Sequence, residues 1–387
     1  MAPWKRRIAI LCAVVAWSVT GCGPKPAPVE LQVRGWAALP ASPLSPRTEA
    51  HAFWTGERVL VIGGSDGQPC PPNADCAMPV GPPLTDGAAF DPSSGEWAEI
   101  APAPLPLGHL SGAVLSDVLY VFVQGLEPAP GRRGFLAYHV ADNRWEELDA
   151  PPVPGVTNLE LVAAGDLLVA YHPSQESGVS PDLLYDPATG EWTDLPVDPL
   201  APSFDRSAVW TGRELLLVGV EVVPNPNSAR PSLYRIAGLD LASASWRQLP
   251  DSEVLGWNPT WFWAGDRLIN PSIGSADGGQ VNNWGRAFPF GGILDPVSGA
   301  WSPLPDTPAV ANVYQGLSVG GPEFLVSSEG FVLHAPTLKW APLTKPRVGE
   351  EAGAASVWAG DRLVLWGGVR SNGAAPMLVG DGWTWLP

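Results

Sequence analysis

The chain has 387 residues, of which 45% are hydrophobic, and it contains 43 glycines, 45 prolines and 19 tryptophans. So many turn-forming residues beside enough apolar residues for a core favour an all-β fold of short strands joined by turns, and they exclude a disordered chain. The formal net charge of −17 repels phosphate backbones and anionic lipids, which argues against nucleic-acid binding and against docking to a membrane by charge.

The chain begins with a segment that is typical of an export signal. Three basic residues at 5–7 precede an apolar run over 8–17, and small residues then lead to Cys22. An apolar run of about ten residues is too short to span a bilayer as a helix, which needs about 20 residues. We therefore predict that residues 1–21 are a leader that is removed, and not a membrane anchor.

The residues Val-Thr-Gly-Cys that end at Cys22 resemble the lipobox of bacterial lipoproteins. The resemblance implies that a lipid carrying palmitate is attached to the Cys22 thiol. It also implies an exported protein held on a bacterial membrane, either the outer membrane facing the periplasm or the cell surface. An ordinary secretory signal with an incidental cysteine is the alternative. The proline-rich residues 22–35 are then a stiff tether between the lipid and the folded part of the chain.

Two further cysteines, Cys70 and Cys76, lie close together in a proline-rich stretch. A zinc site would need two more ligands nearby, and this stretch holds no histidine. In an exported chain, a close pair of cysteines most simply forms a disulfide bond. We therefore predict a Cys70–Cys76 disulfide bond.

Downstream of the tether, two short phrases recur. The first ends in a tryptophan, as in FDPSSGEW at Trp97, YDPATGEW at Trp192 and LDPVSGAW at Trp301. The second begins with a tryptophan, as in WTGERVLVIGG at Trp54 and WAGDRLVLWGG at Trp358. Tryptophans in the place of the first phrase follow one another at intervals of about 40 to 60 residues. Such a period, with four short strands in each unit, predicts the blades of a β-propeller.

The chain length predicts a seven-bladed β-propeller of four-stranded antiparallel blades, formed by a single domain over 36–387, with six or eight blades as alternatives. In the first unit we expect strands over 51–56, 57–64, 86–92 and 96–102. Each recurring tryptophan is expected to pack between neighbouring blades.

Closure of the ring has two candidate segments. The residues that begin at Trp36 and those that begin at Trp383 both look like a fourth strand. One should complete the last blade and the other should lie outside it. We favour the C-terminal segment as the one that completes the blade.

The units resemble the Kelch repeat. A glycine pair ends the second strand at Gly63-Gly64 and again at Gly367-Gly368, and an aromatic residue stands about seven positions before the tryptophan. Other units lack the glycine pair; the second unit, for example, has Gln124-Gly125 at this position. The resemblance covers nearly the whole chain after the tether and implies a propeller like the central domain of galactose oxidase. The copper chemistry of such oxidases requires a free cysteine crosslinked to tyrosine, which the close cysteine pair does not offer.

The expected links between the second and third strands are long, whereas the other turns are tight. These links lie at about 65–86, 125–134, 220–231 and 270–291. In an antiparallel blade all of them emerge on one face, and loop-rich faces usually carry function. Trp257 and Trp284 belong to this region and are candidate platforms for sugar rings or peptide side chains.

Polar residues recur on the first strand of each unit, which is innermost in a propeller. The candidate channel or ligand-binding residues are Arg47, Glu49, His51, His109, Glu160, Asp205 and Arg206. We expect the two arginines near the mouth of the central channel. The channel either binds a sugar, a peptide or a metal ion, or simply holds water. A Ca²⁺ ion bound by Glu49, Glu160 and Asp205 is one candidate, but the spacing selects no metal or other cofactor.

Two functions remain open. The first is a non-catalytic binding or scaffold module, monomeric and membrane-anchored, that binds a protein or a cell-envelope glycan through its long-loop face. The second resembles periplasmic sialic-acid epimerases or glycosidases, with Glu49, Asp205 and His51 among its acid, base and electrostatic groups. Because no diagnostic motif supports catalysis, we prefer the binding module and assign no catalytic residue.

Overall fold

The computed structural model describes most of the chain after the expected tether. The described residues are 35–69, 81–124, 133–153, 158–223, 230–256, 259–274, 284–285, 287–346, 351–371 and 375–387. Contacts divide the chain into two units, Met1–Gln32 and Val33–Pro387, and every described residue belongs to the second. The predictions for the leader 1–21, Cys22, Cys70, Cys76 and Trp257 lie outside the described residues.

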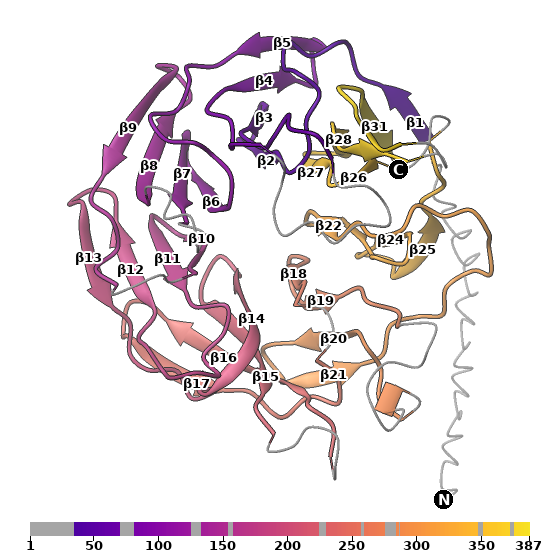
Figure 1. The fold of residues 1–387 in the computed structure, drawn as a ribbon. Helices are drawn as coiled ribbons and strands as arrows, with labels where there is room; N and C mark the ends of the chain where they lie inside the picture. The colour runs from indigo at the N-terminus through magenta and orange to yellow at the C-terminus, as the bar shows by residue number, and fades with distance from the viewer. Residues whose placement is uncertain are drawn as a thin grey trace, which may run out of the picture. The chain divides into compact units, whose positions relative to one another are not determined.

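Seven four-stranded antiparallel sheets surround a central axis, so the predicted seven-bladed β-propeller is confirmed (Figure 1). Blade 1 contains β2 (His51–Trp54), β3 (Val59–Ile62), β4 (Gly87–Asp91) and β5 (Glu96–Glu99). Blade 2 contains β6 (Leu110–Leu115), β7 (Val118–Val123), β8 (Gly134–His139) and β9 (Arg144–Leu148). Blade 3 contains β10 (Glu160–Ala164), β11 (Leu167–Tyr171), β12 (Leu183–Asp186) and β13 (Glu191–Asp194).

The next three blades repeat this order. Blade 4 contains β14 (Ser203–Trp210), β15 (Leu215–Glu221), β16 (Tyr234–Asp240) and β17 (Ser245–Gln248). Blade 5 contains β18 (Phe262–Trp263), β19 (Leu268–Asn270), β20 (Gly292–Asp295) and β21 (Ala300–Ser302). Blade 6 contains β22 (Val319–Gly320), β23 (Phe324–Val326), β24 (Phe331–His334) and β25 (Lys339–Pro342).

Blade 7 joins the two ends of the described chain, in the order β27 (Ala355–Ala359), β28 (Arg362–Trp366), β31 (Gly382–Leu386) and β1 (Gly35–Ala38). A small sheet beside it contains β26 (Glu351–Ala352), β29 (Val369–Arg370) and β30 (Met377–Leu378). The preference for the C-terminal segment as the fourth strand is therefore wrong. That segment is the third strand, and the N-terminal β1 covers its free edge.

The second strand of each blade is apolar on both faces because a neighbouring blade covers each face. In β3, Val59 and Val61 pack in a cluster with blade 7, whereas Leu60 and Ile62 pack in a cluster with blade 2. All four side chains are fully buried. Alternate side chains of a strand point to opposite faces, so a continuous apolar run is what such a position requires.

The tryptophans of the fourth strands hold neighbouring blades together, as predicted. In six of the seven blades, the indole N–H donates a hydrogen bond to a backbone carbonyl in the link that leaves the preceding blade. These bonds are Trp97–Pro40 (3.1 Å), Trp145–Ala101 (2.8 Å), Trp192–Asp149 (3.0 Å), Trp246–Pro196 (2.8 Å), Trp340–Pro305 (2.8 Å) and Trp36–Thr344 (2.5 Å). Trp301 departs from the pattern, since its ring packs edge-on against Trp261 at 5.9 Å.

Each glycine pair receives the chain that enters the next blade. Gly64 donates its N–H to the Leu107 carbonyl at 3.0 Å, and Gly368 donates to the Arg47 carbonyl at 2.7 Å. Gly63 has a φ of 64°, and a Cβ there would lie 2.0 Å from the Leu107 oxygen. Only glycine fits both the left-handed backbone and this close approach.

The two faces of the propeller differ in their connections. We call one the long-link face, since it carries the links 63–86, 124–133, 172–182, 222–233, 271–291 and 367–381 between second and third strands. We call the other the short-turn face, since it carries the turns 55–58, 116–117, 165–166, 211–214, 264–267, 321–323 and 360–361 between first and second strands. Within the described residues, no helix has the length and apolar character needed to cross a bilayer.

Candidate functional site

The polar residues expected in the channel lie at the long-link ends of the innermost strands. Glu49, His109 and Asn158 are exposed at equivalent positions of the first three blades, and Asp205 is half-buried at the same position of blade 4. Two residues further along each strand, His51 and Glu160 are half-buried and Ser111 is buried. That these side chains line one end of the central channel remains a prediction.

His51 is used in a contact between blades. Its Nε2 donates a hydrogen bond of 2.8 Å to the carbonyl of Gly108, in the link that enters blade 2. Burial lowers the pKa of His51, and the hydrogen bond to Gly108 only partly opposes this effect. A neutral imidazole that donates to a carbonyl accounts for this histidine without a ligand.

Two carboxyl groups of the channel bind their protons more tightly than usual. Burial raises the pKa of Glu160, while the Ser111 hydroxyl and the charge of His109 oppose the rise. Burial also raises the pKa of Asp205, and the nearby carboxylate of Glu176 adds to the effect. In enzymes, carboxyl groups that act as general acids often have raised pKa values.

The backbone is left-handed at two of these carboxylate residues. Glu49 has a φ of 58° and Asp205 has a φ of 45°. Asp205 lies in a β-bulge of blade 4, where the register between β14 and β15 shifts between Phe204 and Ser207. The Glu49 N–H donates to the Gly353 carbonyl at 3.0 Å, which ties this turn of the chain to blade 7. Backbone conformations of this kind are concentrated at functional sites.

Arg47 is buried in an ion pair and does not reach the channel mouth. Its side chain is 1% exposed. Its guanidinium donates to both oxygens of Asp86 at 2.6 and 2.9 Å, and to the Gly63 carbonyl at 3.2 Å. The hydrogen bond from Arg47 holds the pKa of Asp86 below its usual value. These bonds hold both ends of the long link 63–86, which the sequence did not reveal.

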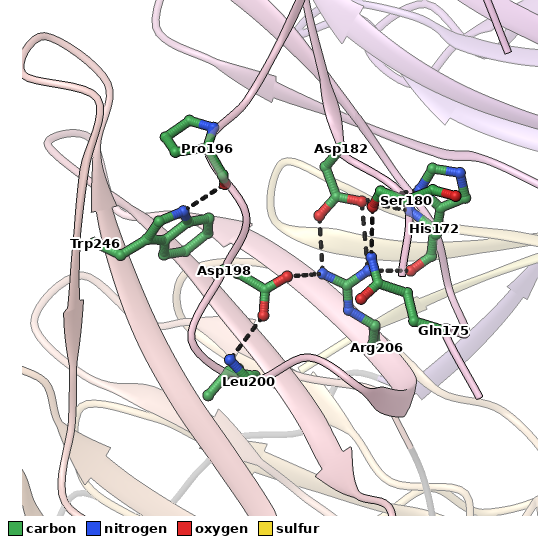
Figure 2. A network of polar contacts seen from close by, with 9 residues as sticks. All are labelled: His172, Gln175, Ser180, Asp182, Pro196, Asp198, Leu200, Arg206 and Trp246. Carbon is green, nitrogen blue, oxygen red and sulfur yellow. Dashed lines mark hydrogen bonds and ion pairs between the residues drawn. The ribbon is translucent and has the colours of Figure 1, made fainter. Parts of the chain in front are cut away.

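Arg206 lies at the centre of a buried polar network between blades 3 and 4 (Figure 2). Its guanidinium bonds both oxygens of Asp182, one oxygen of Asp198 at 2.8 Å, and the His172 carbonyl at 2.9 Å. The side chains of Arg206, Asp182 and Asp198 are 0%, 6% and 3% exposed. Burial raises the pKa of Asp198 despite the charge of Arg206. The arginine expected at the channel mouth is therefore buried, and both of its terminal nitrogens bond groups of the protein.

The network also fixes the link 172–182. Asp182 accepts hydrogen bonds from the His172 backbone N–H at 2.9 Å, and the His172 Nδ1 lies 3.1 Å from the same oxygen. Gln175 donates its side-chain amide to the Ser180 carbonyl at 2.8 Å. The long-link face of blade 3 therefore has a defined conformation.

Trp284 is half-buried near blade 5. Its ring lies 6.2 Å from that of Phe288 in an edge-to-face arrangement, and its carbonyl accepts hydrogen bonds from the N–H groups of Ala287 and Phe288. The backbone of Trp284 therefore stabilises a local turn, and its side chain is partly exposed to solvent.

The described part of the chain brings together no group of three or more His, Cys, Asp or Glu side chains that could hold a metal ion. Among these residues, Glu49, Glu160 and Asp205 thus form no such group.

The other end of the channel holds a feature that was not predicted from the sequence. An open cavity of about 490 Å³ lies among the ends of the innermost strands of blades 2 to 6. Its lining is mostly apolar and includes Val114, Val209, Trp210, Phe262 and Trp263. The signal was present in the sequence, because the last residues of these strands are apolar. A prediction based on polar residues did not include them.

A scan of protein-family models and a search of curated proteins found no match to this chain. The assignment of the architecture therefore rests on the order and pairing of the strands. These establish an all-β protein with seven four-stranded antiparallel blades arranged as a β-propeller.

Proposed function

We propose that this protein is an exported, membrane-anchored Kelch-type propeller that acts as a non-catalytic binding or scaffold module. Its binding surface is the long-link face, and its partner is a protein or a cell-envelope glycan. The observation that carries the proposal is the asymmetry of the two faces. Six blades place a long link on one face, whereas the turns on the opposite face span only two to four residues. Long loops on a rigid scaffold are where binding residues concentrate.

The contacts of the channel residues support a binding role over catalysis. His51 bonds the Gly108 carbonyl, and the guanidinium groups of Arg47 and Arg206 are buried and held in ion pairs with carboxylates of the protein. Side chains engaged in this way are not available to bind substrate or to transfer its protons. A polar ligand would instead meet Glu49, His109 and Asn158, which are exposed on the long-link face.

The Kelch-type assignment is supported by how the repeated residues are used. The glycine pairs at Gly63-Gly64 and Gly367-Gly368 receive the entering chain of the next blade through matched backbone hydrogen bonds. The fourth-strand tryptophans tie each blade to the one before it. Both roles follow from the residues that carry the resemblance.

The membrane anchor is proposed from the lipobox-like residues that end at Cys22, with the lipid on the Cys22 thiol. The direction of β1 suits such an anchor. Fourth strands run from the short-turn face toward the long-link face, so the chain enters β1 at the short-turn face. A tether of extended chain from residue 22 to 35 would span roughly 40 Å.

Replacement of Cys22 tests the anchor. The variant Cys22→Ser should move the protein from the membrane fraction to the soluble fraction, because the thiol that accepts the lipid is gone. Retention of this variant in the membrane fraction would refute lipid anchoring.

Binding through the long-link face is tested by shortening one link. Residues 274–288 are replaced by a short Gly-Ser linker, and the variant is compared with wild type in capture of envelope proteins and in binding to an array of envelope glycans. We expect loss of the captured ligand with an unchanged thermal unfolding temperature. The matched control replaces the short turn 92–95 with Gly-Ser residues and should retain binding. Equal binding by all three proteins would refute the role of this face.

A second candidate function is a glycan-active enzyme that uses carboxyl groups at the channel. The raised pKa values of Glu160 and Asp205, and the left-handed backbone of Asp205, favour it. Turnover of a sialoside or another glycan by the purified protein, with loss of turnover in Glu160→Gln and Asp205→Asn, would establish catalysis. Absence of turnover together with intact ligand capture in both variants would support the binding module.

A further inference from the structure

The short-turn end of the channel is an aromatic cavity without an assigned role. The innermost strands of five blades contribute half-buried apolar side chains to its wall, and the cavity has a volume of about 490 Å³. Trp210 and Trp263 line it from blades 4 and 5, and Val114 and Val162 line it from blades 2 and 3. The space is large enough for one bulky apolar side chain of a partner.

Two further cavities lie between blades on the same face. Pro322 lines both the aromatic cavity and a second cavity of about 500 Å³, whose wall also includes Glu323, Asp361 and Leu386. Asp361 in turn lines a third cavity of about 500 Å³ between blades 7 and 1. The short-turn face thus has neighbouring cavities, an apolar one at its centre and others with carboxylates in their walls.

Every turn between a first and a second strand carries one carboxylate. These residues are Glu57, Asp117, Asp166, Glu214, Asp266, Glu323 and Asp361. Three of them are paired with arginines, at 2.7 Å for Glu214–Arg247, 2.6 Å for Asp266–Arg267 and 2.8 Å for Asp361–Arg362.

The other carboxylates near the aromatic cavity carry uncompensated charge. Asp117, Asp166 and Glu323 are exposed, and no ion pair within the described residues involves them. They follow directly after the strand ends of blades 2, 3 and 6 that line the cavity. The apolar centre is therefore bordered by negative charge on several sides.

We propose that the short-turn face is a second binding site, which takes a basic segment of a partner protein. A bulky apolar side chain of that segment enters the cavity beside Trp210 and Trp263, and flanking lysines or arginines lie against Asp117, Asp166 and Glu323. Charge complementarity selects this occupant. A net charge of −17 disfavours an anionic lipid surface, a nucleic acid or a second copy of the chain at the same place. Aromatic walls also favour cations through the faces of their rings.

The experiment uses two fluorescein-labelled nine-residue peptides as probes. One carries lysines around a central tryptophan flanked by leucines, and its twin carries glutamate in place of every lysine. Fluorescence anisotropy with the full chain should show binding of the lysine peptide only, and this binding should weaken as salt is added.

Substitutions locate the binding. Ala163→Phe fills the cavity from blade 3 and should weaken binding of the lysine peptide by about tenfold or more. Glu323→Lys and Asp166→Lys change exposed turn residues, so folding should be unaffected, and each should weaken binding several-fold. The matched control is Glu191→Lys, an exposed residue at the start of β13 on the outer edge of the same face, which should bind like wild type.

Four results would overturn the proposal. Equal binding of the two peptides would show that charge does not select the ligand of this face. If Ala163→Phe, Glu323→Lys and Asp166→Lys leave binding of the lysine peptide unchanged, the peptide binds at another place on the protein. A dimer in sedimentation analysis that Ala163→Phe converts to a monomer would make a second copy the occupant. Binding of the lipid-free Cys22→Ser protein to phosphatidylcholine vesicles that Ala163→Phe abolishes would make a lipid surface the occupant.

Discussion

Trp36 and Trp385 lie opposite each other on the antiparallel strands β1 and β31, so the two ends of the described chain form neighbouring strands of one blade. The same pairing joins Phe90 to Trp97 in blade 1 and Tyr185 to Trp192 in blade 3. Trp385 thus occupies the position of the aromatic residue that precedes the recurring tryptophan in other blades, and Trp36 occupies the position of that tryptophan.

Loss of the closing tryptophan should destabilise the propeller. Trp36→Ala removes ring packing and the hydrogen bond to Thr344, so the free energy of unfolding should fall by about 2–4 kcal/mol. Trp36→Phe keeps an aromatic ring and loses only the hydrogen bond, so the fall should be about 1 kcal/mol. Urea denaturation followed by tryptophan fluorescence measures both. Equal midpoints for Trp36→Ala and wild type would show that β1 does not close the ring.

Alanine at the first glycine of a pair should cost more than alanine at an exposed turn glycine. Gly63 has a φ of 64° and faces the Leu107 carbonyl, whereas Gly95 has a φ of 74° and no atom within 4 Å of the place that a methyl group would take. Gly95→Ala should lower the free energy of unfolding by about 1–2 kcal/mol through the left-handed backbone alone. Gly63→Ala adds a backbone collision and should cost more. Thermal unfolding of the two variants is the measurement, and similar shifts would contradict this prediction.

Removal of the charge at the centre of the network in Figure 2 should be strongly destabilising. Arg206→Met leaves the buried carboxylates of Asp182 and Asp198 without a cation, so the free energy of unfolding should fall by about 3–5 kcal/mol. The control Arg230→Met breaks an exposed pair with Glu221 and should change stability by about 1 kcal/mol or less. Chemical denaturation compares the two, and a small effect of Arg206→Met would show that the network contributes little.

The stability of the protein should depend on pH through Glu160. Because burial raises its pKa, the folded chain binds this proton more tightly than the unfolded chain does. The contribution of Glu160 to stability is therefore present below the ordinary carboxyl pKa and is lost as the pH rises through the raised value. The Glu160→Gln variant lacks this loss, so its stability relative to wild type should increase as the pH rises above the ordinary carboxyl pKa.

Asp86 provides a control of opposite sign for that experiment. The hydrogen bond from Arg47 lowers its pKa, so its contribution is present above the ordinary aspartate pKa and is lost as the pH falls through the lowered value. Asp86→Asn should therefore lose stability relative to wild type as the pH rises from about 2 to 5. Parallel pH profiles for the two variants in thermal unfolding would contradict both assignments.

The repeated phrases predicted the blades well because they encode local structure. The expected strand over 51–56 is observed as His51–Trp54, and the one over 86–92 as Gly87–Asp91. Closure of the ring was predicted incorrectly because a third and a fourth strand both present tryptophans. Which of them pairs with β28 depends on contacts between the ends of the chain, and local sequence does not specify these.

The candidate site was predicted only in part. Glu49 and His109, which alternation along the innermost strands made candidates for the channel, are exposed at the long-link ends of these strands. The burial of Arg206 could not be predicted, because its partners Asp182 and Asp198 come from separate links that meet only in the folded propeller. The aromatic cavity was missed because its wall gathers two or three residues from each of five blades.

By itself, the sequence determined the class of fold and the number of blades, because strand period, turn residues and tryptophan spacing are local properties repeated along the chain. The tertiary structure alone decided which terminal strand closes the ring, which arginines are buried in ion pairs, and where apolar and acidic surfaces meet. These features depend on residues far apart in sequence, and their energies arise only when the blades pack around the common axis.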